Sequence, residues 1–219
     1  MAYYSLADFK KKYKTHKKRL KIGNKVFYFH VPDSIDKLLD PVDPLKEFPL
    51  WARIWEAAIL LALEIVSIPP TPNGRILEIG AGLGVVGIVA SCQGHNTTIT
   101  EYDSRALDFI RANVVENACT KTQVLRLDWY SPKLEGQFDL ILGSEVVYRH
   151  GDFIPLHSLF HRFLKPHGRV ILAEGLRKTS MDFFSHMSDD FHIQAKKKTI
   201  TTEDETVSVI LATMRPKMA

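Results

Sequence analysis

Cysteine is scarce in this sequence, and no long apolar segment occurs in it. The 219 residues include two cysteines, Cys92 and Cys119, which form no CxxC pair. This scarcity disfavours a disulfide framework and a cysteine-built metal site, and it is typical of a reducing compartment, here expected to be the cytoplasm. The most apolar stretch covers residues 57–63 and stops at Glu64. A transmembrane helix needs about 20 apolar residues, so we expect neither a span nor a membrane partner.

The N-terminus also lacks the pattern of a secretory signal, since no apolar core follows its charges. Hydrophobic residues make up 45% and charged residues 25%, which excludes a wholly disordered or fibrous chain. At about 150 residues per domain, this length predicts one large domain with an extension. We expect a basic N-terminal extension over residues 1–49, with a short strand and a proline-rich loop, and one domain over residues 50–219.

Positive charge is concentrated in one segment, residues 10–25, called the basic arm here. It contains nine lysines or arginines and no acidic residue. Because the whole chain carries +4, the remainder carries −5. We expect residues 1–22 to be helical or mobile. The basic arm either serves solubility as a solvated surface or engages an acidic macromolecule, and it contains no nucleic-acid-binding motif.

Strand-like and helix-like patterns alternate after residue 50. Residues 50–66 are apolar nearly all round, which predicts a buried helix. Beyond them, β-branched and aromatic runs predict strands, and apolar residues three or four apart predict helices. The expected strands cover residues 25–31, 75–79, 97–100, 122–127, 138–142, 169–173, 192–198 and 206–214, and the further expected helices cover residues 85–93, 104–117, 153–164 and 180–187.

This alternation predicts an α/β fold with a Rossmann-like, doubly wound sheet and helices on both of its faces. From residue 75 onward the sheet has seven expected strands. The last two are joined by a short acidic turn, so they form an antiparallel C-terminal hairpin on an otherwise mostly parallel sheet.

The most informative stretch is ILEIGAGLGVVG, residues 76–87, which follows an expected strand and opens an expected helix. Gly80, Gly82 and Gly84 lack Cβ atoms, so the loop backbone can approach a ligand closely. The spacing is GxGxG, because Val85 occupies the third glycine position of the dinucleotide fingerprint. The loop therefore predicts a nucleoside-type cofactor and disfavours a nicotinamide dehydrogenase.

Acidic residues end the next two strands. Glu101 follows Gly80 by 21 residues, and its carboxylate can accept both hydroxyl hydrogens of a ribose. Asp128 ends the third strand and can accept from an adenine amino group, with Trp129 beside it as an apolar wall. Each acid alone is typical of a turn or a cap. At successive strand ends behind a glycine loop, they predict a cofactor site.

The segment LEIGAGLG, residues 77–84, resembles the first motif of the seven-strand S-adenosylmethionine-dependent methyltransferases almost letter for letter. The resemblance covers residues 50–214 and implies S-adenosyl-L-methionine as the cofactor. In that family the acid at the position of Glu78 faces the amino group of the methionine part of the cofactor. The antiparallel C-terminal hairpin is also a feature of that fold.

A narrower resemblance is to the group that contains the cytosolic protein-lysine methyltransferases. Residues 53–63, RIWEAAILLAL, look like its VWDAA-type helix, and residues 126–129, RLDW, match its LDW motif. SEVVY, residues 144–148, is similar to its DxxY signature, with Glu145 in place of the aspartate and Tyr148 as the tyrosine. The resemblance implies that these two residues are catalytic.

Trp51 and Trp55 also fit the WAxxW pattern of bacterial relatives in this group, some of which are nicotinamide N-methyltransferase-like. Trp55 is expected over the cofactor loop, or it is a core tryptophan. The expected cofactor-binding residues are Trp55, Glu78, Gly80, Gly82, Gly84, Glu101, Asp128, Trp129 and Ser144. No metal ligand is expected, because metal spacing is absent among His30, His95, His150 and His167.

Methyl transfer from a sulfonium to a lysine needs the neutral amine. Lysine has a pKa of about 10.4, so neutralising it near pH 7.4 costs about 4 kcal/mol in water. Burial beside a sulfonium cation lowers that pKa, whereas the carboxylate of Glu145 raises it. We assign Glu145 to capturing and orienting the ammonium, with proton acceptance as a secondary role. Tyr148 offers its π face or its hydroxyl to the amine.

The resemblance implies an S-adenosylmethionine-dependent N-methyltransferase that acts on a lysine of a protein substrate. Two alternatives stay open: the same transfer onto a small-molecule nitrogen or oxygen, and a non-catalytic cofactor-binding protein. A protein acceptor predicts an open, acidic groove beside Tyr148, and a small acceptor predicts a closed pocket. The intact acids Glu78, Glu101 and Glu145 favour an enzyme. The acceptor, the number of methyl groups added and the oligomeric state stay open.

Overall fold

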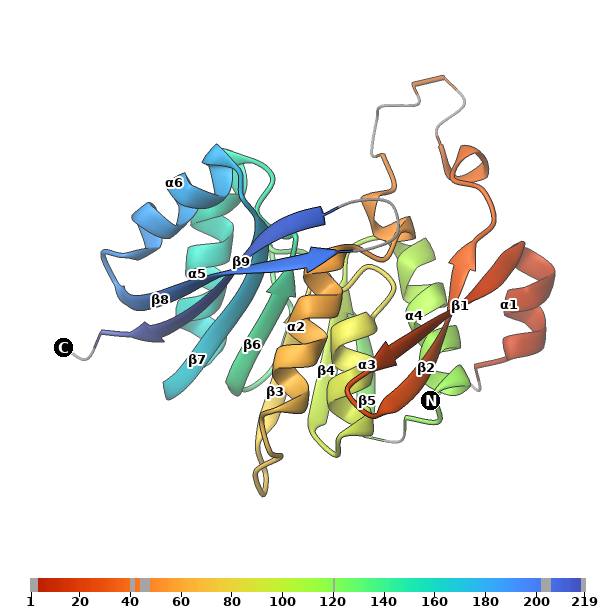
Figure 1. Cartoon of the computed structure of the whole chain (residues 1–219), viewed down its shortest axis with the longest axis horizontal. Helices are drawn as coiled ribbons and strands as arrows, with labels where there is room; N and C mark the ends of the chain where they lie inside the picture. The colour runs from red at the N-terminus through yellow and green to blue at the C-terminus, as the bar shows by residue number, and fades with distance from the viewer. Residues whose placement is uncertain (1–3, 40–41, 44–47, 120, 202–205, 218–219) are drawn as a thin grey trace.

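A seven-stranded sheet forms the centre of the molecule in a computed structural model that describes residues 4–39, 42–43, 48–119, 121–201 and 206–217. The strand order is β5–β4–β3–β6–β7–β9–β8 (Figure 1). The strands are β3 (Arg75–Ile79), β4 (Asn96–Glu101), β5 (Thr122–Arg126), β6 (Phe138–Ser144), β7 (Leu164–Gly175), β8 (Phe191–Thr201) and β9 (Thr206–Pro216).

The strand directions confirm the expected fold class. β9 runs antiparallel to both β7 and β8, whereas the pairs from β5 through β7 are all parallel. From β3 the chain moves outward through β4 and β5, then returns to β6 on the other side of β3. In open α/β sheets, ligands bind at the carboxyl ends of the strands where the order reverses in this way.

Helices cover both faces of the sheet (Figure 1). The first layer is α2 (Glu56–Val66), α3 (Val85–Cys92) and α4 (Ser104–Glu116), and the second is α5 (Phe153–Phe163) and α6 (Lys178–Met187). Alternate strand residues serve the two layers: in β6, Leu140 and Leu142 join the first core and Ile141 joins the second. None of the helices in the described ranges has the length and apolarity needed to cross a membrane.

The basic arm is an ordered part of the fold. α1 (Leu6–Lys12) is followed by β1 (Thr15–Ile22), which pairs antiparallel with β2 (Lys25–Pro32). The expectation of a helical or mobile segment over residues 1–22 is therefore wrong beyond α1. Two features hide β1 in the sequence. Only Leu20 and Ile22 are buried in it, and the hairpin depends on a tight turn in which Gly23 has a φ of +60°.

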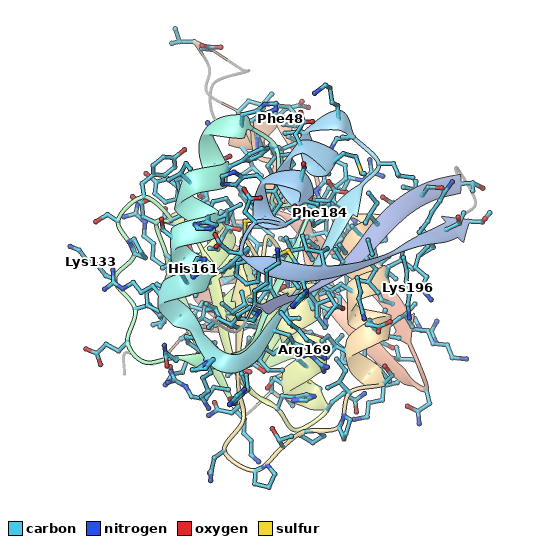
Figure 2. All side chains as sticks on the ribbon, turned by 90° about the vertical axis from the view of Figure 1, so that its left-hand side faces the viewer. Phe48, Lys133, His161, Arg169, Phe184 and Lys196 are labelled. Carbon is cyan, nitrogen blue, oxygen red and sulfur yellow. The ribbon has the colours of Figure 1, made fainter. Side chains whose placement is uncertain are left out.

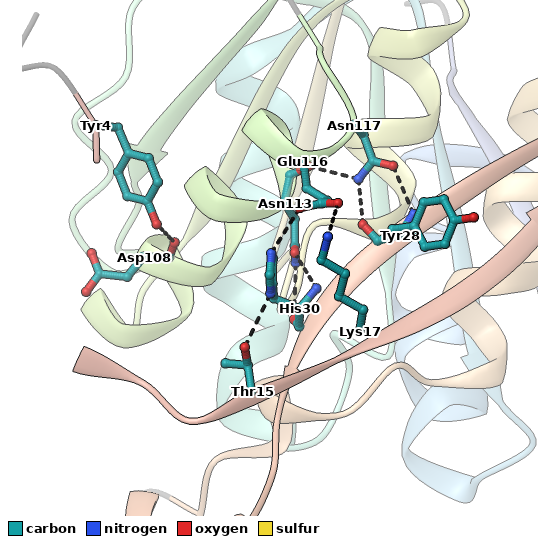
Figure 3. A network of polar contacts seen from close by, with 9 residues as sticks. All are labelled: Tyr4, Thr15, Lys17, Tyr28, His30, Asp108, Asn113, Glu116 and Asn117. Atoms are coloured by element: carbon teal, nitrogen blue, oxygen red, sulfur yellow. Dashed lines mark hydrogen bonds and ion pairs between the residues drawn. The ribbon is translucent and has the colours of Figure 1, made fainter. Parts of the chain in front are cut away.

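Asn113 of α4 and Asn117, the residue that caps its C-terminal end, hold the edge of β2 (Figure 3). The side chain of Asn113 accepts from the backbone N–H of His30 at 2.7 Å, and that of Asn117 accepts from the N–H of Tyr28 at 3.0 Å and donates to its carbonyl at 2.8 Å. Four residues of helix advance about 6 Å and two residues of strand about 6.6 Å. The two amides therefore match alternate residues of the strand.

Acids of α4 also pair with the basic arm. Lys12 lies 2.8 Å from Asp108, and Lys17 lies 2.5 Å from Glu116. The hydroxyl of Tyr4 donates to the carbonyl of Asp108 at 2.9 Å. Residues 4–31 therefore pack on the same core as α2, α3 and α4.

Two elements begin several residues away from the expected position, the largest differences among the boundaries. Residues 50–66 are not one helix, because a 3-10 turn, Leu50–Ala52, precedes α2. The indole of Trp51 donates to Asp103 at 2.9 Å, and this tertiary contact overrides the local helix propensity. β7 begins at Leu164, directly after α5, rather than at residue 169. Two further 3-10 turns cover Asp36–Leu38 and His150–Asp152.

Candidate functional site

A cavity of about 490 Å³ opens at the carboxyl ends of the central strands. It is lined by the glycine loop after β3, by the end of β4 and by residues 127–130, which follow β5. Residues 144–146, 148 and 149, at the end of β6 and just beyond it, also line the cavity. Parts of residues 48–58, which lead into α2, complete the lining. The volume lies within the range of about 300–1,000 Å³ that is typical of small-molecule sites.

Gly80 and Gly82 let the backbone form part of the cavity lining. Their φ angles are +55° and +56°, a backbone conformation that residues with a side chain rarely adopt. A Cβ on Gly80 would lie 2.9 Å from Val146 and 3.2 Å from the ring of Trp129. A Cβ on Gly82 would lie 3.3 Å from the carbonyl oxygen of Trp51. Larger residues at either position would strain the loop and crowd its neighbours.

Gly84 does not line the cavity. It precedes α3 with a φ of +80°, and a Cβ there would lie 3.2 Å from Ile110 of α4. Its place is in the packing of α3 against α4, so it supports the loop from behind.

Glu78 also lies behind the glycine loop, with 2% of its surface exposed. Its carboxylate accepts from the N–H of Gly87 at 2.8 Å, and Gly87 has no room for a Cβ beside that oxygen. Burial raises the pKa of Glu78 to about 8. In the structure this carboxyl group bonds to the first turn of α3, and its contact with the amino group of a cofactor stays a prediction.

Glu101 lies on the cavity at the end of β4. Its Oε2 accepts from Gly82 N–H at 2.9 Å, and its Oε1 accepts from Tyr102 at 2.6 Å and Asp103 at 3.3 Å. Burial raises the pKa of this carboxyl group, and the three backbone donors oppose the shift. A carboxylate oxygen has two lone pairs, so Oε2 keeps an acceptor position for a ribose hydroxyl. The same group therefore holds the loop and can hold a ligand.

The expected adenine end of the site is also on the cavity. Oδ1 of Asp128 accepts from Tyr130 N–H at 2.9 Å, and Oδ2 has no partner among the described residues. Trp129 and Ser144 line the same cavity. Trp55 lines it too, with its indole N–H donating to Leu50 at 2.8 Å.

Glu145 has an uncommon backbone conformation for a residue with a side chain, with a φ of +51°. Its own N–H donates to Ala173 at 2.9 Å, and its Oε1 accepts from Gly175 N–H at 2.9 Å. Both bonds reach β7, the neighbouring strand. They fix the carboxylate at the cavity, where Oε2 meets the guanidinium of Arg177 at 2.5 Å.

Arg177 lies close to three groups beside the cavity. Besides Glu145, it contacts Glu174 at 3.1 Å, and its guanidinium lies 5.4 Å from the ring centre of Tyr148. Glu174 is fully buried and accepts from Val146 N–H at 2.8 Å. Burial, followed by the charge of Glu145, raises the pKa of Glu174 to about 8. One guanidinium thus stands between two closely spaced carboxyl groups.

Tyr148 lines the cavity and is 39% exposed. Desolvation, followed by the carboxylates of Glu174 and Glu145, raises the pKa of its hydroxyl above the ordinary value. The phenol therefore stays protonated at neutral pH, and it can donate a hydrogen bond or present its ring to a cation.

Of the eleven residues expected at the site, all but Glu78 and Gly84 line this one cavity. Sequence reasoning missed Glu174 and Arg177. Glu174 has a signal like that of Glu101, since it is an acid near the end of a strand. Arg177 has none, because only the folded loop after β7 brings it to Glu145.

These features fit S-adenosylmethionine. The cavity has suitable volume, a backbone cradle at Gly80 and Gly82, and carboxylates at Glu101 and Asp128 that suit ribose and adenine. The residues that would hold the cofactor therefore line the same cavity as Glu145 and Tyr148.

Comparisons with known proteins identify the family of the chain. Residues 49–190 match the family described as lysine methyltransferase. A mouse (Mus musculus) protein named EEF1A lysine methyltransferase 3 is 32% identical over 172 residues, covering 75% of this chain and 72% of that protein. Protein N-lysine methyltransferase METTL21A of Xenopus tropicalis is 32% identical over 155 residues, covering 68% and 72%.

Among solved structures, the precorrin-6y C5,15-methyltransferase of Geobacter metallireducens superposes with a TM-score of 0.60 at 17% identity, covering 72% of this chain and 86% of that one. This likeness concerns the fold alone. The sequence matches go further: the chain belongs to the lysine methyltransferase family, and it is an S-adenosylmethionine-dependent methyltransferase.

Proposed function

We propose that the acceptor is the side-chain amine of a lysine on a protein, and that Glu145 and Tyr148 receive it. The observation that carries this proposal is the carboxylate of Glu145, held at the cavity beside Tyr148 and already paired with a cation, Arg177. A lysine ammonium has the same charge as this guanidinium, so it suits the same carboxylate. Tyr148 and Arg177 are about two-fifths exposed, which supports access by a side chain on the surface of a large acceptor.

Bound S-adenosylmethionine supplies an electrophilic methyl group on a sulfonium. Gly80, Gly82 and Glu101 would hold it, with Asp128 and Trp129 at its adenine end. In-line displacement depends on positioning, so the residues of the chain act mainly by orienting the amine. Glu145 draws in the ammonium, and Tyr148 places its ring or hydroxyl against the nitrogen.

Arg177 affects the protonation state of the acceptor lysine beside Glu145. A lone carboxylate stabilises the ammonium form of lysine, which is unable to attack the methyl group. The guanidinium of Arg177 offsets the charge of Glu145, so the amine loses its proton at a lower pH than it would beside the bare carboxylate. Glu145 can then orient the nitrogen without holding it fully protonated.

Substrate recruitment by the basic arm belongs to the same proposal. Five exposed cations of the arm have no partner among the described residues: Lys10, Lys14, Lys18, Arg19 and Lys21. Ring contacts connect the arm to the cavity, since Tyr13 packs on Phe109 and Phe109 packs on Trp51. An acidic surface on the protein substrate would suit these charges. Charge reversal at Lys18, Arg19 and Lys21 should then raise KM, and less so at higher salt.

A cytoplasmic location is also part of the proposal, because Cys92 and Cys119 are both free thiols.

The test of the acceptor is a labelling experiment with product analysis. Purified protein is incubated with methyl-labelled S-adenosylmethionine and a cell lysate, and labelled proteins are digested and identified by mass spectrometry. We expect N-methyl-lysine on a macromolecule. Label only in small molecules, only on another residue type such as histidine, or in no product would overturn the proposal.

A further inference from the structure

A cluster of metal-ligating side chains lies away from the cavity, where α5, α6 and β8 meet. His157 and His161 are four residues apart on α5, and Asp190 lies between α6 and β8. One ligand atom from each residue lies within 4.8 Å of the other two. Figure 2 labels His161 on the part of α5 that faces the viewer.

The distances within this cluster approach those of a metal site. Nε2 of His157 lies 2.7 Å, and Nε2 of His161 lies 3.7 Å, from Oδ2 of Asp190. In a tetrahedral zinc site with ligand bonds of about 2.0–2.1 Å, ligand atoms are about 3.4 Å apart. The two observed distances bracket that value, so small rotations of the side chains would open a position equidistant from all three.

The backbone around the cluster is held in place. Residues four apart on a helix lie on the same side, so both imidazoles face one point. The N–H of Lys217, just after β9, donates to the carbonyl of Asp190 at 2.8 Å. The three ligands are therefore presented by elements that the fold has already fixed, which lowers the ordering cost of binding an ion.

A third imidazole borders the cluster. The ring of His186 on α6 lies 5.6 Å from that of His157. Its Nε2 is buried and has no hydrogen-bond partner among the described residues. Beside the cluster there is therefore one buried imidazole nitrogen, Nε2 of His186, that no hydrogen bond in the described part of the chain uses.

We propose that His157, His161 and Asp190 form a binding site for a divalent transition-metal ion of the zinc type. Two imidazoles and one carboxylate suit Zn²⁺, Ni²⁺ or Co²⁺ and are a poor set for Mg²⁺ or Ca²⁺, which prefer oxygen ligands. The side chains are 26%, 48% and 49% exposed, so water can complete the coordination. This site departs from the expectation of no metal ligand, which did not consider the pair His157 and His161.

The consequence is structural, because the cluster is not among the residues that line the cavity. An ion there would tie α5 to the chain between α6 and β8. A ligand that binds the folded protein alone raises its stability in proportion to the logarithm of the ligand concentration over Kd. Micromolar binding should therefore appear as a dose-dependent rise in Tm.

The test is a titration of the full chain, stripped with a chelator and dialysed, with Zn²⁺ at pH 7.5. We expect one ion per chain by calorimetry, Kd in the micromolar range, and a Tm rise of about 5–10 °C at 100 times Kd. Mg²⁺ at the same concentration should leave Tm unchanged. Cobalt added to the stripped protein should give the visible absorption of a four-coordinate site.

The matched variants are His161→Ala and His192→Ala. His161 is an exposed ligand, so its loss should weaken Zn²⁺ binding at least tenfold and leave the metal-free Tm close to that of the wild type. His192 is an exposed histidine of β8 outside the cluster, and its variant should bind as the wild type does. Asp190→Asn repeats the test with a nearly isosteric change. Binding weaker than millimolar in the wild type, or equal affinity in the wild type and both ligand variants, would overturn the proposal.

Discussion

The guanidinium of Arg177 lies 2.5 Å from Oε2 of Glu145, and it lies over the ring of Tyr148. A cation of the chain thus already contacts the carboxylate that we propose for the acceptor amine. Glu174, buried behind them, contacts the same guanidinium. The charge beside Glu145 is therefore set in part by Arg177, a residue that no sequence motif marks.

Replacing Arg177 should change the pH dependence of turnover. In Arg177→Gln the carboxylate of Glu145 is no longer offset, so it should hold the bound lysine in its ammonium form. We expect the rising limb of the kcat profile to move to higher pH by about one unit, with cofactor affinity unchanged. Arg177→Lys should restore much of the wild-type profile.

Lys178→Gln, next in sequence and paired with Asp182 on the surface, serves as the control. A wild-type profile in Arg177→Gln would show that Arg177 has no influence on the amine.

Glu78 should make the stability of the ligand-free protein depend on pH. Its pKa is raised from 4.5 to about 8 by burial, so the folded state keeps a proton that the unfolded state releases. The folded state then binds more protons across this interval, and the free energy of unfolding falls as pH rises from about 4.5 to about 8.

Glu78→Gln keeps the acceptor for Gly87 and removes the titration. Its Tm should fall less than that of the wild type between pH 5 and 8, whereas Glu135→Gln, an exposed change, should leave the slope as it is. Parallel slopes for Glu78→Gln and the wild type would contradict the assignment.

Glu101→Ala should weaken binding of S-adenosylmethionine by about 1–3 kcal/mol, roughly 5- to 150-fold. The variant loses the acceptor for ribose and also the bond that holds Gly82 N–H. Calorimetry on the variant, with Glu135→Ala as the surface control, measures the effect. Equal affinities in the wild type and in Glu101→Ala would place the ribose elsewhere.

Asn113→Ala should destabilise the whole domain by about 1–3 kcal/mol, because a buried amide with partners on two segments is lost. Its side chain bonds to His30 of β2 and to Leu83 of the glycine loop. Asn117→Ala, which loses bonds to Tyr28 at a more exposed position, is the milder comparison. Thermal unfolding of both variants at low and high salt checks the order. An unchanged Tm in Asn113→Ala, together with a large fall of Tm at high salt in the wild type, would show that charge alone holds the hairpin of β1 and β2.

Much of the fold could be predicted from the sequence, because β-branched strands, amphipathic helices and the glycine loop carry local signals. β1 could not, since its residues are mostly charged, and its burial at Leu20 and Ile22 depends on packing against α2 and on its pairing with β2. The gathering of Glu101 and Asp128 at one cavity could be predicted, because a parallel sheet brings its strand ends to one edge. The contact of Arg177 with Glu145 could not, because only the folded loop after β7 forms it. Glu78 and Gly84 were expected on the cavity from their motif, but packing against α3 and α4 places them behind it.

The central claim is that Glu145 and Tyr148 act on the acceptor and leave cofactor binding to other residues. It is tested most directly by measuring S-adenosylmethionine affinity and methyl-lysine formation in Glu145→Ala and Tyr148→Phe. We expect both variants to bind the cofactor within about 1 kcal/mol of the wild type and to lose most of their turnover. Turnover at the wild-type rate in either variant, or a loss of turnover that follows entirely from lost cofactor affinity, would contradict the account.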